Sequence, residues 1–129
     1  MKKRWAWLGW LWCSPWVVVF WGLYVLPCWT LGWLRYRRWL ATGVAEFEVV
    51  ARDNWFARAW SGWSGFGGPG FILVKYQDRV LVAHEVRHVR QWFVLGPLFP
   101  IVYLILLAGF GYDDHPLEHD ARIVRRDPN

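Results

Sequence analysis

The amino-acid sequence predicts an α+β protein, mostly helical with a short sheet, preceded by an N-terminal transmembrane helix or hairpin. Three observations predict this architecture. Nine of the 13 tryptophans fall in the first 39 of the 129 residues, and eight of them lie within a long uncharged stretch. A short run of β-branched and aromatic residues then precedes a well-capped helical segment. A second apolar segment follows. We therefore divide the chain into a Trp-rich anchor over 1–39 and a small domain over 40–129.

The N-terminal stretch is long enough for a membrane anchor. No charged residue occurs from Trp5 to Leu34, whereas a spanning helix needs about 20 apolar residues. Tryptophan also favours membrane interfaces. The basic residues Arg35, Arg37 and Arg38 separate the stretch from the next small residues, which disfavours a removable signal peptide. The sequence therefore predicts an integral membrane protein with a retained N-terminal anchor.

Two arrangements of this anchor are open, because Ser14-Pro15 and Pro27 interrupt it. One is an interfacial turn over 5–13 followed by a spanning helix over 16–34. The other is a short helical hairpin that enters and leaves on one face of the membrane. Basic residues on both flanks leave the orientation undetermined, because the positive-inside rule needs a charge difference.

Strand-like segments follow the anchor. The segment 43–51 suits a strand or the start of a helix, and 71–76 predicts a strand after the Gly-rich breaker run 67–70. The segment 60–66 contains two glycines, so it is either a surface loop or the edge of a cleft where an extended substrate backbone approaches.

A helix is predicted over 79–94. Asp78 is its expected N-cap, and Gly96-Pro97 is a clear stop. This helix carries His84 and His88, which share one face because residues four apart lie on the same side of a helix. Two imidazoles at this spacing can hold one metal ion.

Glu85, which directly follows His84, would lie beside any water that the metal binds. This His-Glu-x-x-His pattern is typical of hydrolytic zinc sites, in which a carboxylate takes the proton of that water. A catalytic zinc usually has three protein ligands, so a third must come from elsewhere. A second helix is expected from Pro116, capped by Asp114 or His115. The candidates for the third ligand lie around its start: Asp113, Asp114, His115, Glu118, His119 and Asp120.

The pattern over about residues 60–124 resembles the gluzincin class of zinc metallopeptidases, in which His-Glu-x-x-His is completed by a glutamate from a later helix. The segment His115-Pro116-Leu117-Glu118-His119-Asp120-Ala121 is similar to the Asn-Pro-x-Glu-x-x-Ala segment of small gluzincins, with His115 in place of asparagine. The resemblance implies a minimal zincin-like domain with Zn²⁺ bound by His84, His88 and Glu118, and with Glu85 as general base.

The implied activity is hydrolysis of a peptide or protein substrate by zinc-activated water. Tyr112 and His115 are candidates to stabilise the oxyanion. Arg87 departs from the pattern, because many metallopeptidases keep this position uncharged. It could reach a substrate carboxylate, a carboxylate beside the metal site or a lipid phosphate, or it could be solvated.

The second apolar run, 92–110, has the hydropathy of a transmembrane helix. A full crossing would place His84 and Glu118 on opposite sides of the bilayer, where they could not share a metal. Gly96-Pro97 and Pro100 favour a broken helix. We therefore expect 98–110 to form a very apolar helix that packs on the motif helix and dips into the lipid without crossing the bilayer.

Cys13 and Cys28 both lie in the apolar N-terminal stretch and are expected to be free buried thiols. The net charge of +5 comes from clusters that flank apolar runs, so membrane lipid is a simpler partner than nucleic acid. Two alternative functions remain at this point. One is a non-catalytic zinc-binding membrane protein with a scaffold or regulatory role. The other is a small membrane-anchoring or membrane-perturbing protein with an incidental motif. Oligomeric state is not predicted.

Overall fold

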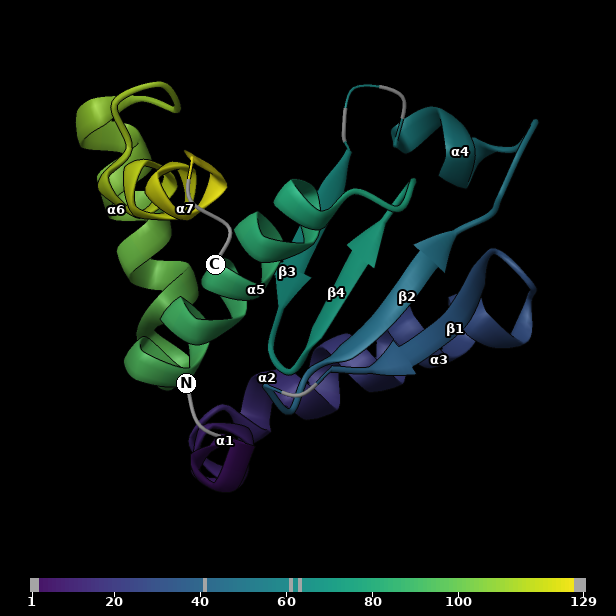
Figure 1. Cartoon of the computed structure of the whole chain (residues 1–129), viewed down its shortest axis with the longest axis horizontal. Coiled ribbons are helices and arrows are strands. Elements are labelled where there is room, and N and C mark those ends of the chain that lie inside the picture. Colours follow the sequence, from purple (N-terminus) through teal and green to yellow (C-terminus); the bar gives the residue numbers. More distant parts are fainter. Residues whose placement is uncertain (1–2, 41, 61, 63, 127–129) are drawn as a thin grey trace.

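The computed structural model describes residues 3–40, 42–60, 62 and 64–126, and it confirms the α+β prediction (Figure 1). In chain order its elements are α1 (Lys3–Trp12), α2 (Ser14–Phe20), the π-helical turn η1 (Trp21–Val25), α3 (Leu26–Thr30), β1 (Leu34–Trp39), β2 (Ala45–Val49), α4 (Trp55–Ala59), β3 (Gly65–Gly68), β4 (Phe71–Val74), α5 (Arg79–Leu95), the 3₁₀ turn η2 (Gly96–Leu98), α6 (Phe99–Phe110) and α7 (Pro116–Arg126).

The four strands form one mixed sheet in the order β1-β2-β4-β3. β2 and β4 are parallel, whereas the β1–β2 and β3–β4 pairs are antiparallel. Helices cover both faces of this sheet. Ile72 and Val74 pack in a core with α5, and Phe71 and Leu73 pack in a second core with η1, α3 and α4. All four β4 side chains are therefore buried, which explains the uninterrupted apolar run that predicted this strand.

Two strands were missed by the sequence prediction. Residues 34–39, assigned to the anchor, form β1, which alternates arginine with aromatic residues and pairs with β2. The Gly-rich run expected to be only a breaker supplies the second half of β3, and Pro69-Gly70 forms the turn of the β3–β4 hairpin. Gly70 has a φ of +88°, which suits the third residue of such a turn.

The strand β3 lies at one edge of the sheet and packs closely against α5. A Cβ on Gly65 would lie 2.7 Å from Glu85 Oε1, and a Cβ on Gly67 would lie 2.5 Å from the Glu85 carbonyl oxygen and 2.8 Å from His88 Cβ. Glycine is needed here because any side chain would push the edge strand away from the helix. Part of the segment 60–66, residues 61 and 63, lies outside the described residues.

The helix predicted over 79–94 is confirmed as α5. Its N-cap is Asp78, whose Oδ1 accepts hydrogen bonds from the amides of Val80 at 2.8 Å and Leu81 at 3.5 Å. The helix ends where Gly96 adopts a φ of +60°. The apolar helix expected over 98–110 is present as α6. It runs back from the C-terminal end of α5, so that α7 returns to lie beside α5 (Figure 1).

The N-terminal helices belong to the same packed structure. Indole N–H groups tie them to the domain: Trp10 donates to the Gly43 carbonyl at 3.1 Å, Trp16 to Pro97 at 2.9 Å and Trp21 to Pro69 at 3.1 Å. The helix expected over 16–34 instead starts at Ser14 and ends at Thr30. It contains the π turn η1 just before Pro27, whose ring and missing N–H disturb the preceding turn.

Membrane-span criteria of length and composition are met in two places among the described residues. The helical stretch Arg79–Phe110 meets them alone, and the N-terminal helices meet them only as a pair bent by 76°. The stretch that qualifies alone therefore contains the motif helix and is not the N-terminal segment. The expected thiols are present, since Cys13 and Cys28 are both free and buried.

A Gly67→Ala substitution tests the close approach of β3 to α5. We expect it to lower the free energy of unfolding by about 1–3 kcal/mol, the usual cost of overpacking. Gly109→Ala is the matched control, because a Cβ on this helical glycine meets nothing within 4 Å. That variant should be neutral or slightly more stable. Denaturant unfolding in mild detergent measures both, and equal stabilities would contradict the packing described here.

Candidate metal centre

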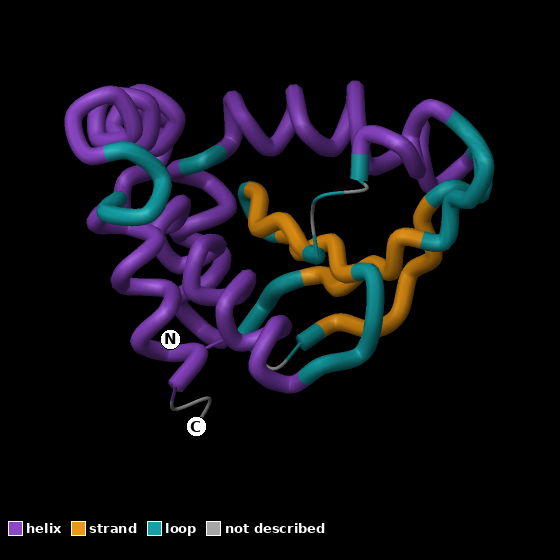
Figure 2. Tube along the Cα trace, turned by 90° about the horizontal axis from the view of Figure 1, so that it is seen from above, coloured by secondary structure: helices purple, strands orange, loops and turns teal. Residues whose placement is uncertain are grey.

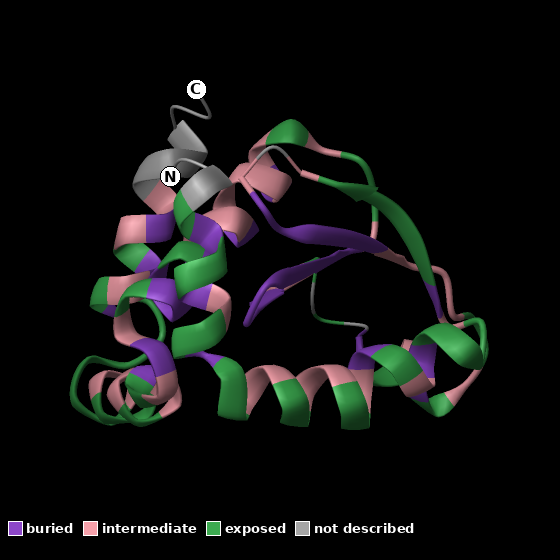
Figure 3. Ribbon diagram, turned by 90° about the horizontal axis from the view of Figure 1, so that it is seen from below, coloured by how far each residue is buried: buried purple, intermediate pink, exposed green. Residues whose placement is uncertain are grey.

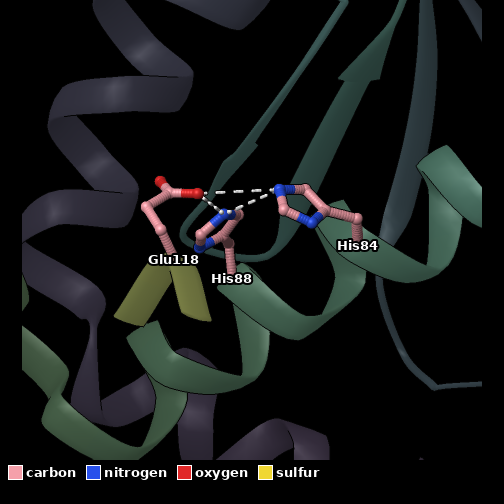
Figure 4. Close-up of side chains that lie close together, drawn as sticks. All are labelled: His84, His88 and Glu118. Carbon is pink, nitrogen blue, oxygen red and sulfur yellow. Dashed lines mark hydrogen bonds and ion pairs between the residues drawn. The ribbon is translucent and has the colours of Figure 1, made fainter. Parts of the chain in front are cut away.

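Three side chains from two helices converge in the space between α5 and α7. His84 and His88 lie one turn apart on α5, and Glu118 lies in the first turn of α7 (Figure 4). The two Nε2 atoms are 3.3 Å apart. Glu118 Oε2 lies 3.4 Å from His88 Nε2 and 3.7 Å from His84 Nε2. The structure thus brings together the three residues predicted as metal ligands.

These three atoms fit a single metal ion of zinc's size. The centre of the triangle that they form lies about 2.0 Å from each of them, which matches Zn–N and Zn–O bond lengths. Glu118 Oε2 is buried and accepts no hydrogen bond from the described residues. A buried carboxylate oxygen without a donor is costly unless a cation satisfies it. The site is therefore a candidate metal centre by geometry and by donor chemistry.

His88 is oriented for metal binding by Gln91. Its Nδ1 lies 2.9 Å from Gln91 Oε1. The Gln91 amide nitrogen donates to the Leu117 carbonyl at 2.8 Å and to Asp120 Oδ2 at 2.9 Å. Gln91 Oε1 can only accept, so His88 Nδ1 must carry the proton. In the neutral ring, which is the form that binds metal, the lone pair of His88 then lies on Nε2, toward His84 and Glu118.

Arg87 forms a bidentate ion pair with Asp120. Its Nε lies 2.8 Å from Oδ2 and its Nη2 lies 2.8 Å from Oδ1. Hydrogen bonding from Arg87 lowers the pKa of Asp120 to about 2. Of the roles considered for Arg87, the structure shows the one in which it pairs with a carboxylate beside the site. Arg87 and Gln91 together fix the ligand-bearing turn of α7 against α5.

Tyr103 of α6 also contacts the site, and the sequence prediction missed it. Its hydroxyl donates to Glu118 Oε1 at 2.9 Å. Burial raises the pKa of the Glu118 carboxyl, but contacts with His88, Tyr103 and His84 outweigh it and lower the pKa to about 2. Glu118 is therefore ionised at neutral pH, as a ligand must be. Tyr103 is the one polar side chain in α6, which is the signal that could have identified it.

His115 has a structural role at the start of α7. It is fully buried, its Nε2 donates to the Tyr103 carbonyl at 2.9 Å, and its Nδ1 accepts the Leu117 amide at 3.2 Å. Both ring nitrogens are thus used, and the expected capping of this helix is confirmed. Tyr112 is 57% exposed, and its ring lies 5.4 Å from the Arg122 guanidinium. The other candidate ligands Asp113, Asp114 and His119 are exposed.

Glu85, predicted as the general base, is buried between α5 and the edge strand β3. It is only 6% exposed, and its carboxylate lies against Gly65 of the edge strand β3. It follows His84 directly on α5, and its backbone carbonyl oxygen lies close to Gly67 of β3.

Comparisons with known proteins add no family to this description. No family model, curated protein or solved structure matches the chain. The His84/His88/Glu118 group is therefore supported by its own geometry and donor chemistry.

Metal analysis of alanine variants tests the ligand set. We expect wild type to bind one equivalent of zinc, and His84→Ala, His88→Ala and Glu118→Ala to lose it, because each removes one of three protein bonds. His119→Ala is the control on the same helix, since His119 is exposed. If Glu118→Ala kept wild-type zinc affinity while His119→Ala lost it, the third ligand would be misassigned.

A double-mutant cycle tests the Arg87–Asp120 pair. Arg87→Ala and Asp120→Ala should each lower zinc affinity about tenfold, because partners of metal ligands typically contribute 10–100-fold. The double variant should bind no worse than the weaker single variant, since both changes break one interaction. Arg58→Ala, at an exposed arginine of α4, serves as the control. Additive effects measured by zinc titration would mean that the pair does not position the site.

Proposed function

We propose that this protein is a membrane-associated zinc metallopeptidase of gluzincin type. The observation that carries the proposal is the convergence of His84, His88 and Glu118, with their ligand atoms 3.3 to 3.7 Å apart, beside the buried carboxylate of Glu85. A purely structural zinc site has four protein ligands and no need of an adjacent base. Here three ligands leave a position for water, which favours catalysis over a scaffold role.

Zinc is the metal that this donor set suits best. Two imidazole nitrogens and one carboxylate oxygen form the His₂Glu set used by catalytic zinc in peptidases. Magnesium and calcium prefer all-oxygen sites. Bound zinc would lower the pKa of its water toward neutrality and polarise a substrate carbonyl.

Residues of this chain would transfer the proton and position the metal ligands. Glu85 would accept the proton of the attacking water at its carboxylate and deliver it to the leaving amine. Gln91 holds His88 in the tautomer that binds metal, and Tyr103 and Arg87 keep Glu118 and its helix in place. None of these steps requires a large movement, because the ligand atoms already lie at bonding separation from one centre.

The edge strand β3 supports a peptide as substrate. It is last in the sheet order, so its outer edge has no strand partner among the described residues. Gly65 and Gly67 of this strand lie against Glu85 and His88. An extended peptide that added to this edge would place its backbone beside the metal centre, a common mode of peptide recognition.

Glu85→Gln tests the catalytic assignment. We expect this variant to keep full zinc content, because Glu85 is not a ligand, and to lose chelator-sensitive peptidase activity by about 10²–10⁴-fold. Activity is measured on a quenched-fluorescence peptide library, with His119→Ala as the active control.

Normal turnover by the Glu85→Gln variant would show that Glu85 is not the base. A zinc-loaded wild type with no hydrolysis of any peptide would favour the non-catalytic zinc-binding role. Absence of zinc from protein purified in mild detergent would instead favour the membrane-anchoring role.

A further inference from the structure

We infer that the chain binds a membrane from one side and lies in the interface, with α2–η1–α3 and α6 together forming its lipid-facing surface. This inference concerns the seating of the protein and does not depend on hydrolysis. In this arrangement the N-terminal helices lie at the membrane surface and do not form a spanning anchor.

Neither apolar helix can cross the bilayer in this fold. The 12 residues of α6 extend about 18 Å, whereas the hydrocarbon core is about 30 Å thick. The chain then returns at once to place Glu118 within 3.4 Å of His88. A crossing would separate these residues by the thickness of the membrane.

The helix α2–η1–α3 is likewise bound to the domain along its length. Its start contacts the domain through the Trp16 hydrogen bond to Pro97, and its end is buried through Val25 and Cys28 against the sheet. The strand β1 follows directly and pairs with β2. A helix held flat on the sheet cannot also project through a bilayer.

The outer sides of these two helices nevertheless remain apolar and uncovered. Leu23 is 79% exposed and Val18 71% exposed on α2–η1–α3, and Leu104 and Ile105 of α6 are 61% and 64% exposed. Only 17% of the most apolar window in Arg79–Phe110 is buried. An apolar surface of this extent calls for a further apolar environment.

Both helices lie on the same side of the molecule. Figure 2 shows α2–η1–α3 along one side, with α6 seen end-on at the same side. Figure 3, from the opposite direction, shows the same arrangement and marks exposed residues along the outward turns. We call the outward side chains of these two elements, together with the exposed Leu31 directly after α3, the apolar face. The helix α1 bends away from it by 76°.

Lipid is the occupant that fits this face. No charged residue occurs between positions 5 and 34 or between positions 91 and 112, whereas a protein interface usually has a polar rim. At the end of α3, the exposed rings of Trp29 and Tyr36 lie 6.0 Å apart, and the exposed Arg35 follows on the neighbouring strand β1. Aromatic rings with a basic residue at the boundary of an apolar surface are typical of membrane interfaces.

Tyr103 connects this face to the metal centre, because α6 carries both its hydroxyl and the exposed Leu104 and Ile105. The centre therefore lies within about one helix diameter, 10–12 Å, of the lipid. If the proposed hydrolysis is correct, its substrate is a peptide segment at the membrane surface.

Spin-label depth measurements test this inference. Single cysteines at Val18, Leu23, Leu31, Leu104 and Gln77 would be labelled in a Cys13→Ala, Cys28→Ala background and bound to 7:3 phosphatidylcholine–phosphatidylglycerol vesicles. We expect the four apolar-face labels to lie at similar depths, about 5–10 Å into the interface. The Gln77 label, in the exposed loop before α5, should stay in water.

A spanning anchor predicts another result, in which depth changes along α2–η1–α3 and the labels at Val18 and Leu31 report opposite leaflets. Spin–spin coupling between copies, with labels inaccessible to lipid, would show that a second copy covers the face. Either result would overturn the inference.

Lysine substitutions give an independent measurement. Leu23→Lys and Leu104→Lys should each weaken vesicle partitioning about tenfold. Each replaces a leucine side chain that would be buried in the lipid by a charged one. Gln77→Lys should not weaken it. Equal partitioning of all three variants would contradict the assigned face. Zinc content, measured on the same samples, reports folding and separates this result from any failure of the proposed catalysis.

Discussion

The structure depends on one constraint, which is that ligand atoms from two helices far apart in sequence must meet within one metal's reach. His84 and His88 fall on the same side of α5 by helical spacing alone, but Glu118 lies 30 residues beyond His88. The intervening segment is the most apolar in the chain. It can bring Glu118 back to α5 only by turning, and the turn occurs at Gly96. The contact between Glu118 and His88 therefore requires the chain to return to α5 after α6.

The constraint is stabilised by polar contacts that surround the ligand triangle. Gln91 joins His88 to α7, Arg87 holds Asp120 on the same helix, and the Tyr103 hydroxyl joins α6 to Glu118. Each contact links two helices, so the three helices α5, α6 and α7 position one another. In the sequence, Arg87 departs from the motif because it places a charge at a position that is usually uncharged. Its partner Asp120 gives it a structural reason, since an unpaired charge beside a buried site would be costly.

The local features of this site could be predicted from the sequence. Helical spacing, the Asp78 cap and the Gly96 stop predicted α5, and Pro116 with His115 predicted the start of α7, because these features depend on nearby residues only. Non-local features were less accessible. β3 is a strand of Gly-Phe-Gly-Gly whose formation depends on pairing with β4 and on packing against α5. The strand β1 was not predicted, because its arginines are equally typical of the basic residues that follow a membrane helix. The contact of Tyr103 with Glu118 depends on how α6 is placed, which no local pattern specifies.

The most direct test of the account is X-ray absorption at the zinc edge of the metal-loaded protein. The account predicts a shell of nitrogen and oxygen atoms at about 2.0 Å with the multiple scattering of two imidazoles. It also predicts that this shell is lost or rearranged in Glu118→Ala and unchanged in His119→Ala. A spectrum with no imidazole contribution, or one that is identical in wild type and Glu118→Ala, would contradict a metal shared by His84, His88 and Glu118.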